Sequence, residues 1–434
     1  MDVKTAVLNG ELDEAIFMEI PEGIAVQTNK AARGYERPLA CGLRKSIYGL
    51  KQAPRAWYSR IYTFFQEHNF IGSDHNHSLF INYEQQIILL LYVEDVVVAA
   101  PTRALVDRIR DKLHHEFQKT DLGPLQTFLG LEMERNRPQR TLHLSQRKYV
   151  HKILSLHGME LCNPVLTPAD PHVRLEKAHE GREVNPEYWR QYQSAVGSLM
   201  YAMLGSRVDI AYAVSKVSQY SSNPDSTHWT AVKRIFRYRA GTPNRGLCYG
   251  LYGEGIGFTN ADWGSGDDLK SIGGYAFLFT GAAVSWTSKK QSTVALSSTE
   301  AECIALTQVV KESIWLQGIL RDLGAIRHLE EIKNIDVDNQ GAIALARNPE
   351  FPTRTKHIDI QYHFVRQYVE NKQITLFYCP TADMTADIFT KALPYPAFLK
   401  HTMGLGLLDH SAFILTETIG PDLDHTRTYN CYIN

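Results

Sequence analysis

The chain has 434 residues, which at roughly 150 residues per domain indicates about three domains or two large ones. Its net charge is −1, which excludes a histone-like protein or one with a polybasic tail but leaves room for a local basic groove. Hydrophobic residues make up 44% and charged residues 21%, so we expect globular domains with proper cores and no wholesale disorder.

Neither the cysteines nor the apolar segments point to an exported or membrane protein. The six cysteines are scattered without a C-x-x-C pair, which argues against a disulfide framework or a zinc site and fits a reducing compartment. The N-terminus lacks the apolar core of a signal peptide. The longest apolar run, residues 87–93, is far shorter than the roughly 20 residues that span a bilayer. We expect an intracellular protein with no membrane partner.

An acidic break interrupts a long apolar stretch in the N-terminal half. Residues 87–100 read IILLLYVEDVVVAA, which predicts a β-hairpin with Glu94 and Asp95 at its tip. Two carboxylates between buried strands are poor for packing, whereas Mg²⁺ prefers such oxygen ligands. The residues alone leave a metal site and a solvated turn both open.

Two basic segments are candidate nucleic-acid surfaces. Residues 43–60 hold five cations, no acid and three interleaved aromatic residues, Tyr48, Trp57 and Tyr58. This composition is typical of a surface that follows a phosphate backbone and stacks on bases. The alternative is a solvated basic helix packed through Leu50 and Trp57. The cations of this segment are Arg44, Lys45, Lys51, Arg55 and Arg60.

The second basic segment belongs to a predicted helix over residues 226–239. An apolar stripe on this helix should be buried, which would leave the cations facing outward as a thumb that grips a duplex. A plain solvated face is the alternative. The cations are Lys233, Arg234, Arg237, Arg239 and, just beyond the helix, Arg245.

From Ile256 onward the pattern is that of a mixed sheet. Three short strands are followed by a long helix over residues 297–323, and then by strands and helices in the order β-α-α-β-α. This order predicts a five-stranded mixed sheet with flanking helices, in which the first three strands are antiparallel and the last two are parallel additions. The final predicted helix covers residues 385–393.

Four acids fall at strand ends and helix starts of this region, where the predicted fold would gather them at one edge. They are Asp262, Glu302, Asp338 and Asp387. Two readings stay open, because acids at these positions also serve as helix caps and stabilise helix dipoles.

Motifs along almost the whole chain resemble one family. In the N-terminal half they are DVKTAVLNGEL at 2–12, SIYGLKQAPRAWY at 46–58, YVED at 92–95, LGLE at 129–132, LSQRKY at 144–149 and SAVGSLMY at 194–201. In this order and spacing they resemble the reverse transcriptase of Ty1/copia-type retrotransposons. The later motifs resemble its ribonuclease H: SKKQSTVALSSTEAECIAL at 288–306, DNQGAIALARNP at 338–349, TRTKHIDIQYHFVRQYV at 353–369 and ADIFTKALP at 386–394.

The resemblance implies a mixed α+β chain with four parts. These are a partial reverse-transcriptase palm over 1–163, a linker and helical thumb or connection region over 164–250, a ribonuclease H-like domain over 251–395, and a peripheral helix with a poorly ordered tail over 396–434. It further implies RNA-directed DNA synthesis and cleavage of RNA in RNA–DNA hybrids by two-metal chemistry with Mg²⁺, or Mn²⁺ as a substitute.

The resemblance also implies roles for individual residues. Asp2, Glu94 and Asp95 would be the palm carboxylates that hold metal. Glu302, Asp338 and Asp387 match the second, third and fourth ribonuclease H acids. Gly49, Gln52 and Arg55 are the nucleic-acid contacts that the resemblance implies. From charge and position alone, we add Lys45 and Lys51 beside the palm, Lys233, Arg234 and Arg237 on the thumb, and Lys356 and His357 near the ribonuclease H site, where simple solvation is the alternative.

Three departures from the family pattern predict weakened chemistry. Glu94 stands where the family has Asp, which moves the carboxylate outward by one methylene. Asn260 stands where the family has its first ribonuclease H acid, and Asp262 lies on the same strand face about 6.6 Å further along. The chain starts at Met1-Asp2, before which the family has a fingers segment. We therefore expect a frayed Asp2, no processive polymerase activity and a severe loss of ribonuclease H activity.

Three hypotheses follow from these residues: an active enzyme fragment, a nucleic-acid-binding pseudoenzyme, and a decayed element copy. The family makes this region within a polyprotein, so integrase and protease segments are the expected partners beside RNA–DNA hybrid and primed template. A cytoplasmic virus-like particle or the nucleus is the location that the resemblance implies.

Overall fold

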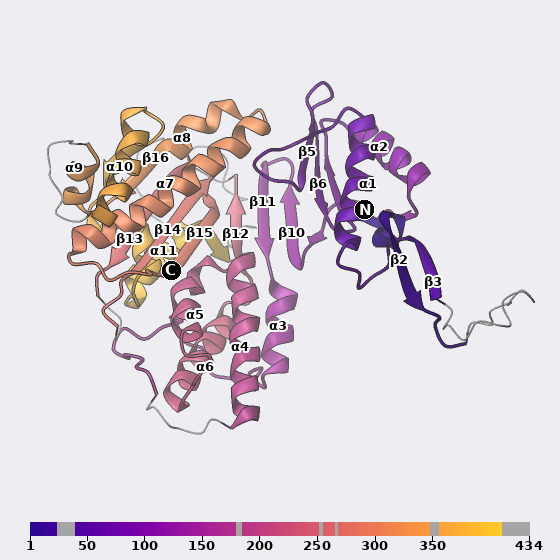
Figure 1. Cartoon of the computed structure of the whole chain (residues 1–434). Coiled ribbons are helices and arrows are strands. Elements are labelled where there is room, and N and C mark those ends of the chain that lie inside the picture. The colour runs from indigo at the N-terminus through magenta and orange to yellow at the C-terminus, as the bar shows by residue number, and fades with distance from the viewer. Residues whose placement is uncertain (24–39, 179–184, 251–254, 265–267, 348–355, 410–434) are drawn as a thin grey trace, which may run out of the picture. The chain divides into compact units, whose positions relative to one another are not determined.

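The computed structural model describes residues 1–23, 40–178, 185–250, 255–264, 268–347 and 356–409 (Figure 1). The chain divides into two compact units. The first comprises Met1–Leu125 with Arg321–Gly324, and the second comprises the remainder. Both units contain sheets and helices, which confirms the predicted mixed class. The predicted domain boundaries stay predictions.

A six-stranded sheet forms the first unit, with the strand order β4-β5-β6-β7-β1-β8. Helix α1 (Ala53–Glu67) starts with Pro54 in its first turn, where a missing N–H costs nothing, and buries Trp57, Ile61 and Phe65 along one face. Helix α2 (Arg103–Glu116) is the second helix of the unit. The strands are β1 (Asp2–Val3), β4 (Ile71–Gly72), β5 (Leu79–Asn82), β6 (Ile87–Tyr92), β7 (Asp95–Ala99) and β8 (Lys119–Thr120), beside a separate pair, β2 (Glu11–Glu19) and β3 (Ala40–Lys45).

The predicted hairpin is confirmed, but its turn lies one residue earlier than predicted, with Asp95 in the strand, and one prediction about the N-terminus is wrong. Strands β6 and β7 pair antiparallel with Tyr92 opposite Asp95, so that Val93 and Glu94 form the turn. Asp2 does not lie on a frayed end. It belongs to β1, which is hydrogen-bonded between β7 and β8 inside the sheet. Ladder bonds on both sides fix its backbone as firmly as that of an inner strand.

The second unit begins with a five-stranded sheet of order β18-β12-β11-β10-β9 and a group of helices. Figure 1 shows α4, α5 and α6 packed side by side with α3 next to them. The predicted peripheral segment contributes β18 to the sheet, and the predicted tail beyond Asp409 lies outside the described residues. The elements are β9 (Thr127–Phe128), β10 (Leu131–Asn136), β11 (Thr141–Ser145), β12 (Arg245–Tyr249), β18 (Leu407–Asp409), α3 (Arg147–Leu156), α4 (Pro186–Gly205), α5 (Ala211–Ser218) and α6 (Ser226–Gly241).

A buried ion pair joins these helices. The guanidinium of Arg207 donates to both carboxylate oxygens of Asp209 at 2.9 and 2.7 Å, and both side chains are fully buried. Arg207 also donates to the backbone carbonyl of Thr242 at the end of α6, at 2.7 Å, and Tyr238 donates its hydroxyl to Asp209. Arg207 and Asp209 therefore both find their hydrogen-bond partners inside the core. A buried ion pair is tolerated when its charges are satisfied in this way.

Replacing Arg207 with Met is expected to destabilise the second unit by about 3–5 kcal/mol, because Asp209 would stay buried without its cation. Urea unfolding followed by circular dichroism measures the loss. Arg234→Met is the matched control, since its ion pair with Asp170 is partly exposed and should contribute less than about 1 kcal/mol. Equal losses in the two variants would contradict this account.

The C-terminal sheet confirms the predicted five-stranded mixed sheet and its strand directions. Strands β15, β14 and β13 are antiparallel neighbours, and β16 and β17 follow in parallel, giving the order β15-β14-β13-β16-β17. The elements are β13 (Ile256–Asp262), β14 (Ile272–Phe279), β15 (Ala282–Lys290), α7 (Ser298–Asp322), α8 (Leu329–Lys333), β16 (Asn334–Val337), α9 (Gln340–Arg347), α10 (Lys356–Glu370), β17 (Thr375–Tyr378) and α11 (Tyr395–Gly404).

The predicted helix over residues 385–393 is wrong in type and length. The segment forms a short 3₁₀ helix, η6 (Thr385–Phe389). The Thr390 N–H and the Thr390 hydroxyl both donate to the Asp387 carbonyl, at 3.1 and 3.2 Å, and such a side-chain bond competes with regular helix. Phe389 presses against β14 at Gly274, where an added Cβ would lie 2.3 Å from the Phe389 Cβ.

No helix within the described part of the chain is long and apolar enough to cross a membrane. Five cysteines are described, and all five are free thiols: Cys41, Cys162, Cys248, Cys303 and Cys379.

His401 of α11 should make the second unit sensitive to acid. Burial lowers the pKa of this imidazole from 6.5 to about 4. Between these two pH values, His401 is protonated in the unfolded chain but neutral in the folded chain. The contribution of neutral His401 to the free energy of unfolding is therefore complete above pH 6.5 and is lost as the pH falls toward 4. We expect His401→Gln to flatten this dependence in thermal melts between pH 7 and pH 4. A slope as steep as that of the unaltered chain would contradict the assignment.

Candidate catalytic sites in the two units

The first unit brings two palm carboxylates face to face. Asp2 and Asp95 are register partners, and the ladder bonds flank them: Val3 N–H donates to the Glu94 carbonyl and Val96 N–H to the Met1 carbonyl, each at 2.8 Å. Such a pair has its Cα atoms about 4.5 Å apart with both side chains on one face. Glu94 lies in the adjoining turn and is exposed. The three predicted ligands are therefore neighbours.

A tryptophan holds the turn that carries these acids. Val93 has a φ of 53°, a conformation that a β-branched residue rarely adopts and that the first central position of a tight hairpin turn demands. The Trp57 indole N–H donates to the Val93 carbonyl at 2.6 Å. Trp57 is only 2% exposed, which agrees with the alternative of a helix packed through Trp57 and rules out base stacking by this residue. Its hydrogen bond connects α1 to the hairpin.

Trp57→Phe should loosen the hairpin turn selectively, because it removes the N–H and leaves an aromatic ring in the core. The lost bond should cost about 0.5–1.5 kcal/mol. Hydrogen exchange of residues 93–96 measures the effect. Phe117→Leu is the control, since Phe117 packs edge-on against the Trp57 ring at 5.4 Å but leaves the indole N–H intact. Equal exchange at the turn in both variants would contradict the role.

The first basic segment lies on the surface of the same unit. Five predicted contact residues are exposed: Lys45, Gly49, Lys51, Gln52 and Arg55. Tyr48, which lies in the same segment, is 56% exposed, so it remains an available stacking partner. Gln52 donates to the Glu14 carboxylate at 2.6 Å.

The second basic segment does not present the predicted outward row of cations. Arg234 donates to the Thr167 carbonyl and pairs with Asp170, and Arg237 donates to the Asn163 carbonyl at 2.6 Å. Arg239 is fully buried. Arg234 and Arg237 hold the segment over residues 163–170 against α6, and only Lys233 of the helical cations is exposed. The apolar periodicity of the helix predicted that these cations face solvent. In the structure, an earlier segment of the chain folds back over that face and contacts Arg234 and Arg237. The side chains of Lys356 and His357, at the start of α10, lie outside the described residues.

The second unit gathers the predicted acids at one edge of the C-terminal sheet. Strands β13 and β16 run parallel with Thr259 opposite Val337, so the next residues, Asn260 and Asp338, occupy neighbouring positions. Glu302 of α7 reaches this edge and accepts the Ala261 N–H at 2.9 Å. Asp387 of η6 accepts a hydrogen bond from the Asn260 amide nitrogen.

Asn260 is held in one orientation. Its side-chain oxygen accepts the Ala261 N–H at 2.6 Å, while its nitrogen donates to Asp387. The second Asp387 oxygen forms an ion pair with the ammonium of Lys391 at 2.8 Å. Thr381 donates to Asp338 at 3.1 Å. Both oxygens of Asp387 therefore already have donors.

Burial and mutual repulsion dominate the electrostatics of this edge. Burial, together with the charges of Asp338 and Asp387, raises the pKa of Glu302 well above its usual value. Burial also raises the pKa of Asp338 and that of Asp387. One Glu302 oxygen, Oε2, is buried without a hydrogen-bond partner. The carboxylates are thus crowded in a setting that favours added positive charge.

Asp262 lies further along β13 and is only half-buried. Its charge reaches the site, since it contributes to raising the pKa of Asp387 and, behind burial, that of Tyr212 to about 12. Asp262 thus acts on the cluster through its field, whereas Asn260 touches Asp387 directly.

The donor chemistry at this edge suits a divalent cation, although the group is not preformed. Within the part of the chain that the structure describes, no three Asp, Glu, His or Cys side chains are arranged to hold a metal ion. The unpartnered Glu302 oxygen and the raised pKa values are nevertheless what a hard cation would relieve. The residues fit such a cation once Asp387 exchanges its nitrogen donors for it.

The comparisons with known proteins bear on this geometry. Residues 1–171 match the family described as reverse transcriptase (RNA-dependent DNA polymerase). The retrovirus-related Pol polyprotein from transposon TNT 1-94 of Nicotiana tabacum is 41% identical over 92% of this chain and 30% of that polyprotein. The putative transposon Ty5-1 protein of Saccharomyces cerevisiae is 32% identical over 72% of this chain and 100% of that protein.

The chain belongs to the Ty1/copia-type retrotransposon Pol family. It spans 30% of the TNT 1-94 polyprotein and so corresponds to a part of that polyprotein. The foamy viral protease–reverse transcriptase in complex with RNA/DNA hybrid has a TM-score of 0.46 and 10% identity, over 88% of this chain and 46% of that chain, which is too low to carry an argument.

Sequence reasoning on this Pol segment missed Lys391 and Thr381, both of which contact the acids. Lys391 had a usable signal, since it follows Asp387 by four residues and opposite charges at that spacing meet on one helical face. Thr381 had none, because its contact with Asp338 joins segments 43 residues apart.

Proposed function

We propose that this segment binds RNA–DNA hybrid and cleaves its RNA strand at the C-terminal site with the help of Mg²⁺, and that Mn²⁺ can substitute. The observation that carries the proposal is the meeting of Glu302, Asp338 and Asp387 at one sheet edge, where the Asn260 side chain completes the group. Membership of a family with this activity supports it.

The bound cations would be held by Glu302, Asp338 and Asp387, and would activate water and stabilise the charge on the cleaved phosphate. The protein's own part is positioning. The Ala261 N–H orients Glu302, and the Thr381 hydroxyl orients Asp338. Burial of the acids excludes water that would otherwise weaken their electrostatic effect.

Asn260 should weaken this activity. An amide keeps one oxygen but carries no charge, so the direct group has three anions where the family pattern has four. The Asn260 oxygen is also engaged by its neighbouring backbone N–H, and its nitrogen binds the very carboxylate that a cation needs. Asp262 adds its charge to the field at Asp387, whereas Asn260 contacts that carboxylate directly.

The first unit supports a second role in binding primed template. Asp2 and Asp95 face one another beside Glu94, and the exposed basic segment lies in the same unit. Nucleotide transfer at this site would use Mg²⁺ held by these acids. We infer that integrase and protease segments are partners within a parent polyprotein, and that the segment works in a virus-like particle or the nucleus.

Cleavage of a labelled RNA–DNA duplex tests the proposal. The purified chain is incubated with Mg²⁺ and then Mn²⁺ beside Asn260→Asp and Glu302→Ala. We expect slow cleavage by the unaltered chain, at least about tenfold faster cleavage by Asn260→Asp because the fourth anion returns, and none by Glu302→Ala.

The same assay has two outcomes that count against the proposal. Equal rates for the unaltered chain and Asn260→Asp would show that the amide does not limit cleavage. No cleavage by Asn260→Asp in either metal would overturn the assignment of a hydrolytic site. Hybrid binding that weakens as salt rises, measured in parallel, separates loss of binding from loss of chemistry.

A further inference from the structure

Within the described part of the chain, Lys391 supplies the ammonium group that contacts the buried acids. Its Nζ lies 2.8 Å from the Asp387 Oδ2, and its side chain is 40% exposed while that of Asp387 is 7% exposed. Within the described residues, Asn260 supplies the other donor to Asp387, so Lys391 supplies the only full positive charge in direct contact. The ion pair therefore offsets repulsion that the three carboxylates would otherwise carry alone.

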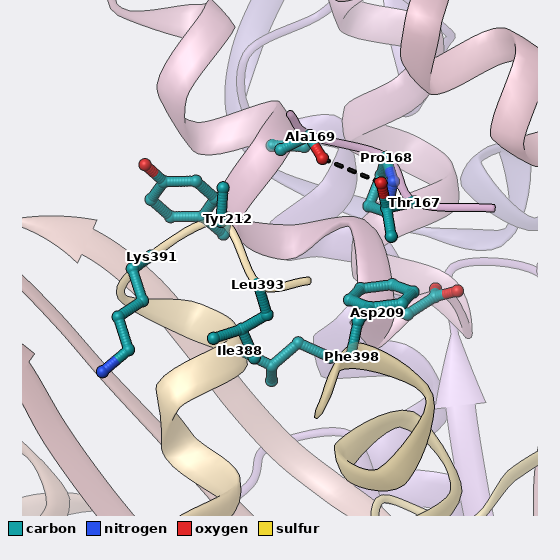
Figure 2. A pocket seen from close by; sticks show the side chains of 11 residues that line it. Thr167, Pro168, Ala169, Asp209, Tyr212, Ile388, Lys391, Leu393 and Phe398 are labelled. Atoms are coloured by element: carbon teal, nitrogen blue, oxygen red, sulfur yellow. Dashed lines mark hydrogen bonds between the residues drawn. The ribbon is translucent and has the colours of Figure 1, made fainter. Parts of the chain in front are cut away.

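The stem of Lys391 is placed separately from its charge. Figure 2 shows the stem beside a small pocket lined by Ile388, Leu393 and Phe398, with the amino group turned away from them. Lys391 thus lines this pocket, while its ammonium reaches Asp387.

We propose that Lys391 is an internal counter-cation that holds Asp387 in the metal-free protein and that a divalent cation must displace. The inference rests on the proposed function, because it concerns the same acids. A metal ion and an ammonium group compete for the same carboxylate oxygen of Asp387. Each therefore lowers the affinity of Asp387 for the other. Lys391 thereby stabilises the empty site and lowers its affinity for metal.

Mutation of Lys391 should have two opposite effects. Lys391→Met keeps the apolar stem and removes the charge. In the Asn260→Asp background we expect the metal-free melting temperature to fall and the affinity for Mn²⁺, measured by isothermal titration, to rise at least about fivefold, the low end of typical couplings between two bound species. A residue that only packed would lower the melting temperature without raising affinity.

Two matched variants serve as controls. Lys391→Arg keeps the charge and should keep the Mn²⁺ affinity of its parent. Lys400→Met removes a neighbouring lysine that pairs with the exposed Asp383 at 2.6 Å, away from the acids, and should leave Mn²⁺ affinity unchanged. Unchanged affinity in Lys391→Met, with Mn²⁺ still binding, overturns the inference and leaves the proposed function standing. No Mn²⁺ binding in any variant overturns both.

A measurement without mutation of Lys391 covers the case in which Lys391→Met does not fold. Brief acetylation with acetic anhydride, read by mass spectrometry, reports how free each amine is. In the Asn260→Asp protein, saturating Mn²⁺ should increase labelling of Lys391 at least about twofold, because the displaced ammonium loses its carboxylate partner, while Lys400 stays constant. Labelling of Lys391 that does not change with bound Mn²⁺ overturns the inference.

Discussion

Repulsion between buried carboxylates is the constraint around which the C-terminal half is organised. Glu302, Asp338 and Asp387 meet where water is scarce, and charges brought together there are costly unless they are paired or hydrogen-bonded. The surrounding chain supplies a hydrogen-bond or ion-pair donor to each of these acids. The Ala261 N–H, the Thr381 hydroxyl and the Lys391 ammonium each bind one carboxylate.

Asn260 also reduces the repulsion between these carboxylates. An aspartate there would add a fourth negative charge, whereas the amide donates a hydrogen bond to Asp387 and so relieves the crowding. The metal-free protein gains an internally satisfied site, and the affinity for a cation falls. Stability and catalysis make opposite demands on this position, as they commonly do where an active site stores unfavourable charge.

In the first unit the main constraint is the strained backbone of the tight turn beside the acids. Val93 occupies a backbone conformation that costs free energy, and the surroundings must over-determine it for it to persist. Trp57 binds its carbonyl from α1, and β1 binds the next carbonyl along from the other side. The same strand that holds the turn also carries Asp2, so support and chemistry come from one element.

The sequence by itself determined the family, the mixed C-terminal sheet with its strand directions and the gathering of its acids at strand ends and helix starts, because these depend on local motifs, hydrophobic alternation and connection rules. Only the tertiary structure decided which partner each charged group meets. Lys391 reaches Asp387, Arg239 is buried, Trp57 serves the hairpin and Asp2 lies inside a sheet. Except for the pairing of Lys391 with Asp387, which lie four residues apart, these arrangements depend on segments distant along the chain, and periodicity within one element carries no information about what packs against it.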